Sequence, residues 1–253
     1  MKLLREIGLL WKRKLVETVR QPTWVFVGLS TPLLYLALFA PLLQKFAGGP
    51  DFRSGSVLDV FVPGILVLMA FGAGMGAGWG IIWEVDTGVI ERLRVTPTSR
   101  FALLMGTVLR DVAMFVIPAL VVIAVAIPFG FHPQWGGTAV LVVLLSLVTV
   151  ITSAWSNALG IILRQIGSLA AVITGLQLPL TLLAGILLPL SIAPLWMQGL
   201  AHVNPLYYAV EASRDLSQGT IISATVMLGF AVMIGLAGLT LWWATRTYRR
   251  AVA

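Results

Sequence analysis

Residues 112 to 163 contain no Lys, Arg, Asp or Glu, and this charge-free stretch limits the fold more than any other part of the chain. A membrane-spanning α-helix needs about 20 mainly apolar residues, so the stretch is far too long for one span. Its middle, PFGFHPQWGG at residues 128–137, is rich in turn-forming residues. The sequence therefore predicts two spanning helices that are separated by this turn.

Four more apolar stretches have the length of a membrane span, at residues 24–43, 60–82, 168–188 and 221–245. The composition agrees, because 58% of the residues are hydrophobic and only 11% are charged. There is no long polar block that would form a separate soluble domain. We therefore predict an all-α membrane protein in which residues 1–253 form a single domain of six transmembrane helices.

The basic residues are divided unevenly between the two predicted sides of the membrane. Of the 17 Lys and Arg residues, only Lys45, Arg53 and Arg214 fall on one side. Lys and Arg concentrate in the cytoplasmic segments of membrane proteins. The distribution places both termini and residues 83–100 in the cytoplasm of a cell whose inner (plasma) membrane the chain spans.

Residues 83–100, WEVDTGVIERLRVTPTSR, carry an unusual number of charges for a connection between two spans. The segment is long enough for a short helix at the membrane surface, which would suit docking to a soluble partner. The alternative is a solvated loop whose arginines only set the topology. The residues themselves favour neither interpretation.

In residues 1–22, apolar side chains recur at spacings of three and four, and basic side chains fall mostly between them. This pattern predicts an amphipathic helix that lies in the membrane interface and ends before Pro22. Such a helix either anchors the chain alone or also contacts a cytosolic partner.

Sequence motifs for chemistry are lacking. A nucleotide-binding P-loop needs a lysine after a glycine, and no lysine of this chain follows one, so any ATP is expected on another chain. His132 and His202 have no partners at metal-ligand spacing, and we expect no metal site. The middles of the predicted spans contain no ionisable residue, which argues against an ion-coupled carrier. A hydrolase that pairs Ser153 or Ser156 with His202 lacks a nucleophile motif.

Uncharged polar residues lie at depth in the predicted fourth and fifth helices: Ser153, Asn157, Thr174 and Gln177. They either hydrogen-bond to neighbouring helices or contact a passing substrate. In the predicted second helix, Gly72, Gly76 and Gly80 form a stripe of small residues. Such stripes allow close helix packing, and the alternative is a sliding surface beside a substrate path.

Residues 189–219 are too numerous for a tight turn and too apolar for a solvated loop. Asn204-Pro205 has the form of a helix start, with an asparagine N-cap and a proline in the first turn. We predict two short helices, at residues 194–203 and 205–216, on the outer side. They form either a lid that seals the bundle or an outer gate. The candidate gate residues are Pro194, Trp196, Asn204, Pro205, Tyr207, Glu211 and Arg214.

Three stretches resemble the membrane subunits of type-2 ABC exporters, in the daunorubicin-resistance and nodulation branch. The first is Phe61-Val62-Pro63-Gly64. The second runs from Glu84 to Arg100, with Thr87-Gly88, Glu91-Arg92-Leu93 and Thr96-Pro97, and continues into Leu103-Leu104-Met105-Gly106. The third runs from Leu188-Pro189 through Asn204-Pro205-Leu206 to Glu211 and Arg214. Together the stretches follow the six-span topology over essentially the whole chain.

The resemblance implies a separate role for each of three segments of the chain. Residues 1–22 would be the elbow helix, residues 83–100 would contain the coupling helix, and residues 189–219 would be the re-entrant outer helices. Two copies of this chain would assemble with two copies of a separate ATP-binding subunit, which would hold ATP and Mg. The residues implied in docking that subunit are Glu84, Thr87, Gly88, Glu91, Arg92, Leu93, Thr96 and Pro97.

The sequence thus predicts a permease subunit without catalytic residues, which exports an amphiphilic drug, lipid or lipid-linked glycan by alternating access. A self-contained carrier or channel is the alternative from a different class, and an intramembrane enzyme is a third. Activity of the purified chain alone would favour either of the latter two.

Overall fold

The computed structural model describes residues 2–20, 28–38, 58–89, 99–186, 190 and 193–251. All regular elements in these ranges are helical, as predicted. In chain order they are α1 (Lys2–Val19), an apolar helix (Gly28–Leu38), α3 (Leu58–Met75), α4 (Ala77–Asp86), α6 (Arg100–Ala126), the 3-10 helix η1 (Ile127–Phe129), α7 (Trp135–Leu163), α8 (Ile166–Leu183), α9 (Leu195–Ala201), α10 (Pro205–Ser217) and α11 (Ala224–Ala251).

Within the described residues, five helical segments are long and apolar enough to cross a membrane: α3 with α4, α6 with η1, α7, α8 and α11. The predicted turn between the third and fourth spans is confirmed, since the chain leaves η1 through Gly130 at a φ of 102° and enters α7 at Trp135. Of the predicted first span, residues 24–43, the structure describes residues 28–38. The helix Gly28–Leu38 covers its middle and is shorter than a span.

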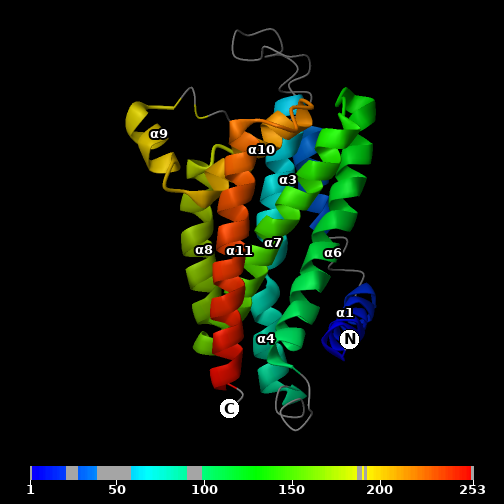
Figure 1. Cartoon of the computed structure of the whole chain (residues 1–253), viewed down its shortest axis with the longest axis vertical. Helices are drawn as coiled ribbons and strands as arrows, with labels where there is room; N and C mark the ends of the chain where they lie inside the picture. Colours follow the sequence, from blue (N-terminus) through cyan, green and yellow to red (C-terminus); the bar gives the residue numbers. More distant parts are fainter. Residues whose placement is uncertain are drawn as a thin grey trace.

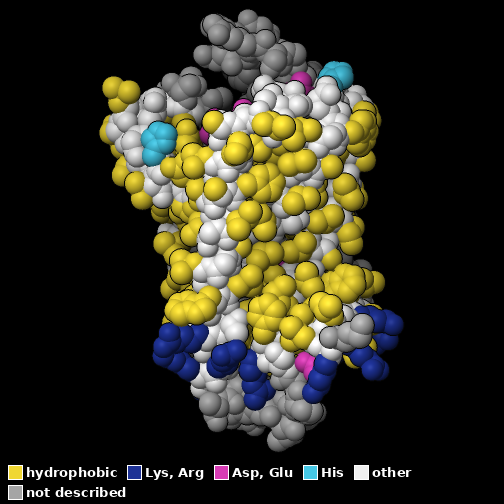
Figure 2. Space-filling model, viewed as in Figure 1, with side chains coloured by type: hydrophobic (Ala, Val, Ile, Leu, Met, Phe, Trp, Pro, Cys, Tyr) yellow, Lys and Arg dark blue, Asp and Glu magenta, His cyan; other side chains and the backbone are white. Residues whose placement is uncertain are grey.

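The long helices run side by side, with α1 near one end of the bundle and α9 and α10 at the other (Figure 1). Hydrophobic side chains cover the middle of the visible face, and Lys and Arg gather at the lower end (Figure 2). We call that end, where α4, α7 and α11 finish and α6 begins, the basic end. The opposite end, where α10 lies, is called the far end.

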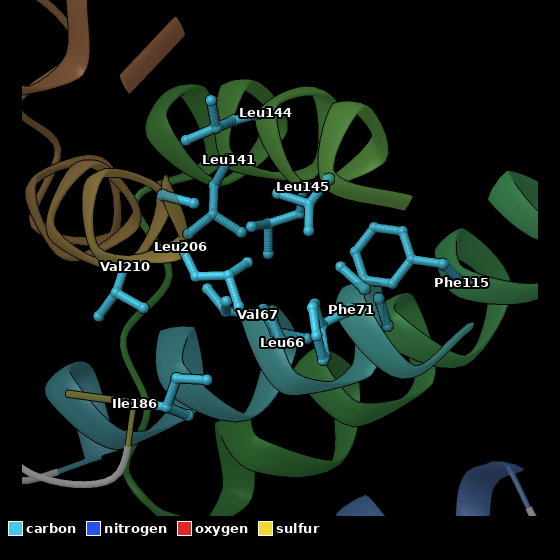
Figure 3. Close-up of a cluster of buried hydrophobic side chains, with 14 of the residues drawn as sticks. Leu66, Val67, Phe71, Phe115, Leu141, Leu144, Leu145, Ile186, Leu206 and Val210 are labelled. Carbon is cyan, nitrogen blue, oxygen red and sulfur yellow. The ribbon is translucent and has the colours of Figure 1, made fainter. Parts of the chain in front are cut away.

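The core of the bundle is built around α7, which packs against α3, α4, α6, α10 and α11. Side chains from α3 (Leu66 and Phe71), α6 (Phe115), α7 (Leu145) and α10 (Leu206) point toward one another in Figure 3. All of them are at most 5% exposed. The short helix α10 is therefore part of the core and not a surface cover, whereas α8 lies at the periphery with only Leu169 and Ile173 buried.

The second span is interrupted at Gly76, which separates α3 from α4. A break inside a membrane helix leaves backbone groups that need other partners. Ser156 of α7 supplies them, because its hydroxyl donates to the carbonyl of Met75 (2.5 Å) and accepts from the N–H of Gly78 (3.0 Å). The position of the break is thus stabilised by a side chain of the neighbouring helix.

The glycine stripe that packs is not the predicted one. A Cβ on Gly74 would lie 2.6 Å from the backbone nitrogen of Ser153 of α7, and a Cβ on Gly78 would overlap the carbonyl oxygen of Ser156 of α7. A Cβ on Gly72 or Gly80 would meet nothing within 4 Å. Gly74 and Gly78 allow the close approach of α7, so the prediction of tight packing along Gly72, Gly76 and Gly80 is wrong.

Two predicted helix boundaries also change. The charge-free stretch that predicts the third spanning helix begins at residue 112, but α6 begins at Arg100, so Arg110 and Asp111 lie well inside it. The final helix continues to Ala251 instead of ending near residue 245. Hydropathy predicts only the apolar part of a helix. Both α6 and α11 extend beyond their apolar parts because the additional residues pack on neighbouring helices.

Candidate functional site

The predicted docking residues begin at the end of α4. Thr87 ends this helix, since its N–H and its hydroxyl both donate to the carbonyl of Trp83 (3.0 and 2.8 Å). Gly88 follows with a φ of 69°, in the left-handed region that commonly terminates helices. Glu91, Arg92, Leu93, Thr96 and Pro97 lie outside the described residues. The structure thus describes only the start of the predicted docking segment.

Glu84, also a predicted docking residue, faces inward. It is 6% exposed and forms an ion pair with Lys14 of α1, whose side chain is 16% exposed. Its carboxylate is therefore occupied within this chain, and the prediction that Glu84 lies on a docking surface does not fit its burial. A cavity of about 20 Å³, the size of one water molecule, adjoins the pair between α1, α4, α6 and α11.

Two further contacts hold α1 against the bundle. Glu6 accepts a hydrogen bond from the N–H of Ser99, which immediately precedes α6 (3.2 Å). Leu10 packs on Gly106, where a Cβ would lie 2.8 Å from the Leu10 Cβ. No residue of α1 is buried (Lys2–Val19, all of them described), so these contacts together with the Lys14 pair define how α1 is attached.

Asp111 is the centre of a buried polar cluster at the basic end. One carboxylate oxygen accepts from the Ser153 hydroxyl (2.6 Å) and the other accepts from Nε of Arg110 (2.9 Å). Asn157 donates to the carbonyl of Ser153 (2.9 Å) and accepts from the Tyr248 hydroxyl (3.3 Å). The cluster thus joins α6, α7 and α11. The Asp111 side chain is only 4% exposed, so α6 contains a buried carboxylate just before the charge-free residues 112–163.

The four predicted path residues separate into two pairs. Ser153 and Asn157 are fully buried in this cluster, with hydrogen-bond partners inside the chain. Thr174 is exposed and Gln177 is half-buried on α8, at the periphery of the bundle. The structure does not bring the two pairs together on one surface.

At the far end, Asn204 connects two helices. Its Oδ1 accepts from the N–H of Leu206 (3.0 Å), which confirms the predicted N-cap of α10 with Pro205 in the first turn. Its Nδ2 donates to the carbonyl of Leu180 in α8 (2.7 Å). Asn204 is 5% exposed, so one buried side chain both starts α10 and ties it to α8.

Arg214 makes a second connection between α10 and the end of α8. One guanidinium nitrogen donates to Glu211 on the same helix (2.7 Å), and another donates to the carbonyl of Gly185 (2.7 Å). Gly185 has a φ of 68° and follows the end of α8. The predicted pair Glu211 and Arg214 is therefore brought together, with Arg214 buried and Glu211 about one-third exposed.

The remaining gate residues lie more peripherally. Pro194 precedes α9, and Trp196 on that helix is 67% exposed. The Tyr207 ring stacks edge-on against His202 and Tyr208, with centroids 5.0 and 5.4 Å away. Burial and the nearby Glu211 carboxylate raise the pKa of Tyr207 above its usual value, so the hydroxyl stays protonated at neutral pH. Of the gate residues, Asn204, Glu211 and Arg214 make the polar contacts to other helices or to one another.

Residues 5–217 match the family model described as ABC-2 type transporter. The chain belongs to the ABC-2 type transporter family. The match extends from α1 through α10, so both the basic-end and the far-end contacts lie within it. This ABC-2 permease is accordingly a multi-pass membrane protein of an ABC transporter.

Several curated proteins are similar to the ABC-2 permease over most of its length. A transport permease of Cyanophora paradoxa is 30% identical over 215 residues, which cover 84% of this chain and 74% of the relative. A daunorubicin resistance ABC transporter permease protein of Streptomyces coeruleorubidus is 26% identical over 220 residues, covering 86% and 77%. An inner membrane transport permease of Escherichia coli K12 is 27% identical over 192 residues, covering 73% and 71%.

Sequence reasoning missed the polar residues that join helices at the basic end of the ABC-2 permease. Lys14 was expected among the basic residues of an interfacial helix, and Asp111 was not singled out. Tyr248 was not singled out at all, although it is 1% exposed. A signal was available for Asp111, because an acidic residue directly before a long apolar run needs a partner if the helix extends in both directions.

Proposed function

We propose that this permease is the membrane-spanning subunit of an ATP-driven exporter, which moves an amphiphilic substrate out of the cell by alternating access. The observation that carries the proposal is the family match over residues 5–217 together with a similar permease named for daunorubicin resistance. The substrate would be a drug, a lipid or a lipid-linked glycan. Two copies of the chain would work with two copies of a separate ATP-binding subunit, which holds ATP and Mg.

The orientation in this proposal follows from charge. The basic end would face the cytoplasm, with both chain termini, because cytoplasmic segments carry an excess of Lys and Arg. Six spans, with the first covering residues 24–43, would return the chain to its starting side. Residues 1–22 would be the interfacial elbow helix, and α9 and α10 would form the outer re-entrant segment.

In the proposed mechanism, closure of the two ATP-binding subunits moves the segment of residues 83–100, which shifts the paired bundles from inward-open to outward-open. Thr87, Gly88, Glu91, Arg92, Leu93, Thr96 and Pro97 would form the docking surface. Support for a docking segment after α4 comes from Thr87 and Gly88, which end the helix and leave its last turn at the basic end. Of the four predicted path residues, Thr174 and Gln177 remain candidates for substrate contact, whereas Ser153 and Asn157 are buried within the chain.

Co-purification tests this proposal. The tagged chain is extracted in mild detergent, and the partners of the wild type are compared with those of Glu91→Arg with Arg92→Glu. A matched control, Glu17→Arg with Arg20→Glu, reverses one exposed charge near the end of α1 and one directly after it, without changing the net charge. We expect a stoichiometric P-loop ATPase with the wild type and the control, and its loss from the loop variant.

The other outcomes separate the alternatives. An ATPase retained by the loop variant would contradict the docking role of Glu91 and Arg92. Absence of an ATPase from a folded wild-type preparation, together with transport by the chain alone in vesicles, would replace the proposal with a self-contained carrier or channel.

A further inference from the structure

We infer that α1 and the two ends of the connection between α4 and α6 (residues 87–99, called the loop here for its place in the chain and described at 87–89 and 99) move as one body, with Lys14 and Glu6 as the residues that position it. The inference rests on the proposed function, in which the loop transmits the motion of the ATP-binding subunit. It adds that the transmitted motion reaches α1 directly, through contacts at both ends of the loop.

The first contact lies where the chain enters the loop. Glu84 is in the last turn of α4, three residues before Thr87 ends the helix. Its ion pair with Lys14 joins α1 to this last turn, and both side chains are largely buried. A buried charge that loses its partner is left uncompensated, so the pair strongly favours the position in which α1 and α4 are in contact.

The second contact lies where the chain leaves the loop. The first N–H groups at a helix start have no partner within the helix. The Glu6 carboxylate accepts the N–H of Ser99, directly before α6, and a carboxylate at this position is also favoured by the helix dipole. Ser99 makes no side-chain capping bond of its own to α6, so α1 supplies the polar partner at this end.

The third observation is the spacing of the contacts along α1. Glu6, Leu10 and Lys14 are four residues apart, so they lie on one face of the helix. Leu10 packs on Gly106 between the two polar contacts. One face of α1 therefore holds both ends of the loop and the helix that follows it, at three successive turns.

The direct test of the contact uses the purified chain alone. Amide hydrogen exchange is compared between the wild type, Lys14→Gln, Glu6→Gln and the control Lys12→Gln, which changes an exposed lysine on the same helix. We expect exchange to increase at least severalfold in α1 and at residues 84–89 for Lys14→Gln, and in α1 and at residues 99–103 for Glu6→Gln, while the centre of α7 stays unchanged. Exchange in both variants equal to that of the control would overturn the inference.

The positioning role is tested in the complex with the ATP-binding subunit. The measured quantity is the ratio of ATP hydrolysis rates with and without this chain, in vesicles of phosphatidylethanolamine and phosphatidylglycerol. We expect Lys14→Gln to reduce this ratio by about tenfold while binding of the subunit persists, since loss of one partner of a buried pair frees the contact. The charge exchange Lys14→Glu with Glu84→Lys should restore most of it.

If Lys14→Gln shows increased hydrogen exchange but the wild-type ratio of ATP hydrolysis rates, the contact is structural only. This result would overturn the positioning role of Lys14. If the wild-type chain binds no ATP-binding subunit, the proposed function fails, and the exchange experiment alone then decides whether α1 and the loop ends form one body.

Discussion

α1 and α10 are both short amphipathic helices outside the spanning segments, yet the bundle holds them in different ways. α10 buries eight of its residues and lies among α3, α7, α8 and α11. None of the residues of α1 is buried, and α1 packs mainly on α6. α10 is thus an internal part of the bundle, whereas α1 lies on its surface, packed against one helix, α6.

The polar contacts follow the same division. At α10 the side chains Asn204 and Arg214 donate to backbone carbonyls of the α8 region, which stay in place as long as that helix is folded. At α1 the contacts involve charged groups, Lys14 with Glu84 and Glu6 with a single N–H. Substitutions that disrupt the contacts of α10 should therefore destabilise the whole bundle, whereas substitutions that disrupt the contacts of α1 should release only this helix from an intact bundle.

The largest effect is expected where α7 approaches the end of α10. A side chain at Gly137 would overlap the carbonyl of Leu216, whereas one at Gly136 would meet only Ile221, at 3.4 Å. Overpacking of this kind costs about 1–3 kcal/mol. Gly137→Val should therefore lower the thermal unfolding midpoint in detergent clearly more than Gly136→Val. Equal unfolding midpoints of the Gly137→Val and Gly136→Val variants would contradict the proposed difference between the two helices, because the packing of α10 would then contribute as little to stability as that of α1.

A somewhat smaller effect is expected at Asn204. Asn204→Ala removes both the cap of α10 and the hydrogen bond to Leu180, with an expected cost of about 1–2 kcal/mol. Asn204→Ser keeps a capping hydroxyl but is too short to reach α8. Thermal unfolding should rank the variants as wild type, Ser and Ala, in order of decreasing stability. If the Asn204→Ser variant has the same unfolding midpoint as Asn204→Ala, the hydrogen bond to α8 alone accounts for the stabilisation by Asn204.

At α1 we expect local release with little loss of overall stability. Gly106→Leu would displace Leu10, while Gly175→Leu on α8 adds the same side chain where nothing lies within 4 Å. Trypsin should cleave the Lys12-Arg13-Lys14 segment about tenfold faster in Gly106→Leu than in the control, since α1 leaves the surface more often. The unfolding midpoints of the two variants should agree. A large fall in the midpoint of Gly106→Leu would show that α1 belongs to the core.

The smallest effect is expected at the exposed end of α1. Lys2 lies 3.9 Å from Glu6 and its side chain is 77% exposed, so the pair is screened by water. Lys2→Ala should change the free energy of unfolding by less than about 0.5 kcal/mol and leave the tryptic cleavage rate unchanged. A change comparable to that of Gly106→Leu would mean that the attachment of α1 depends on charge at its exposed surface.

Much of the fold was predictable because the lengths of the apolar stretches and the positions of turn-forming residues determine where the helices lie in the sequence. The break between the third and fourth spans and the start of α10 at Asn204-Pro205 were both read correctly from residue types. The glycine stripe was not, for a geometrical reason. Five glycines alternate from Gly72 to Gly80, so two faces of the helix have glycines four residues apart. Only the position of α7 decides that Gly74 and Gly78 are the pair that packs.

The candidate site was less predictable, because its polar residues depend on partners distant in the sequence. Asp111 looks like a charge at a helix end until Ser153 of α7 is placed beside it. Glu84 looks like part of a charged surface until Lys14, 70 residues earlier, is placed against it. Spacing within one segment cannot show such pairs, since neither residue lies within a helical turn of its partner.

The break at Gly76 has a consequence for how the two halves of the second span are oriented. The groups exposed by the break are satisfied by one hydroxyl, Ser156, on another helix. A hydrogen bond tolerates only a few tenths of an ångström before it weakens, whereas a shift by one helical turn is about 5.4 Å. The junction of α3 and α4 is therefore not held by these two helices alone, because an axial displacement of α7 by one helical turn would break both hydrogen bonds of Ser156.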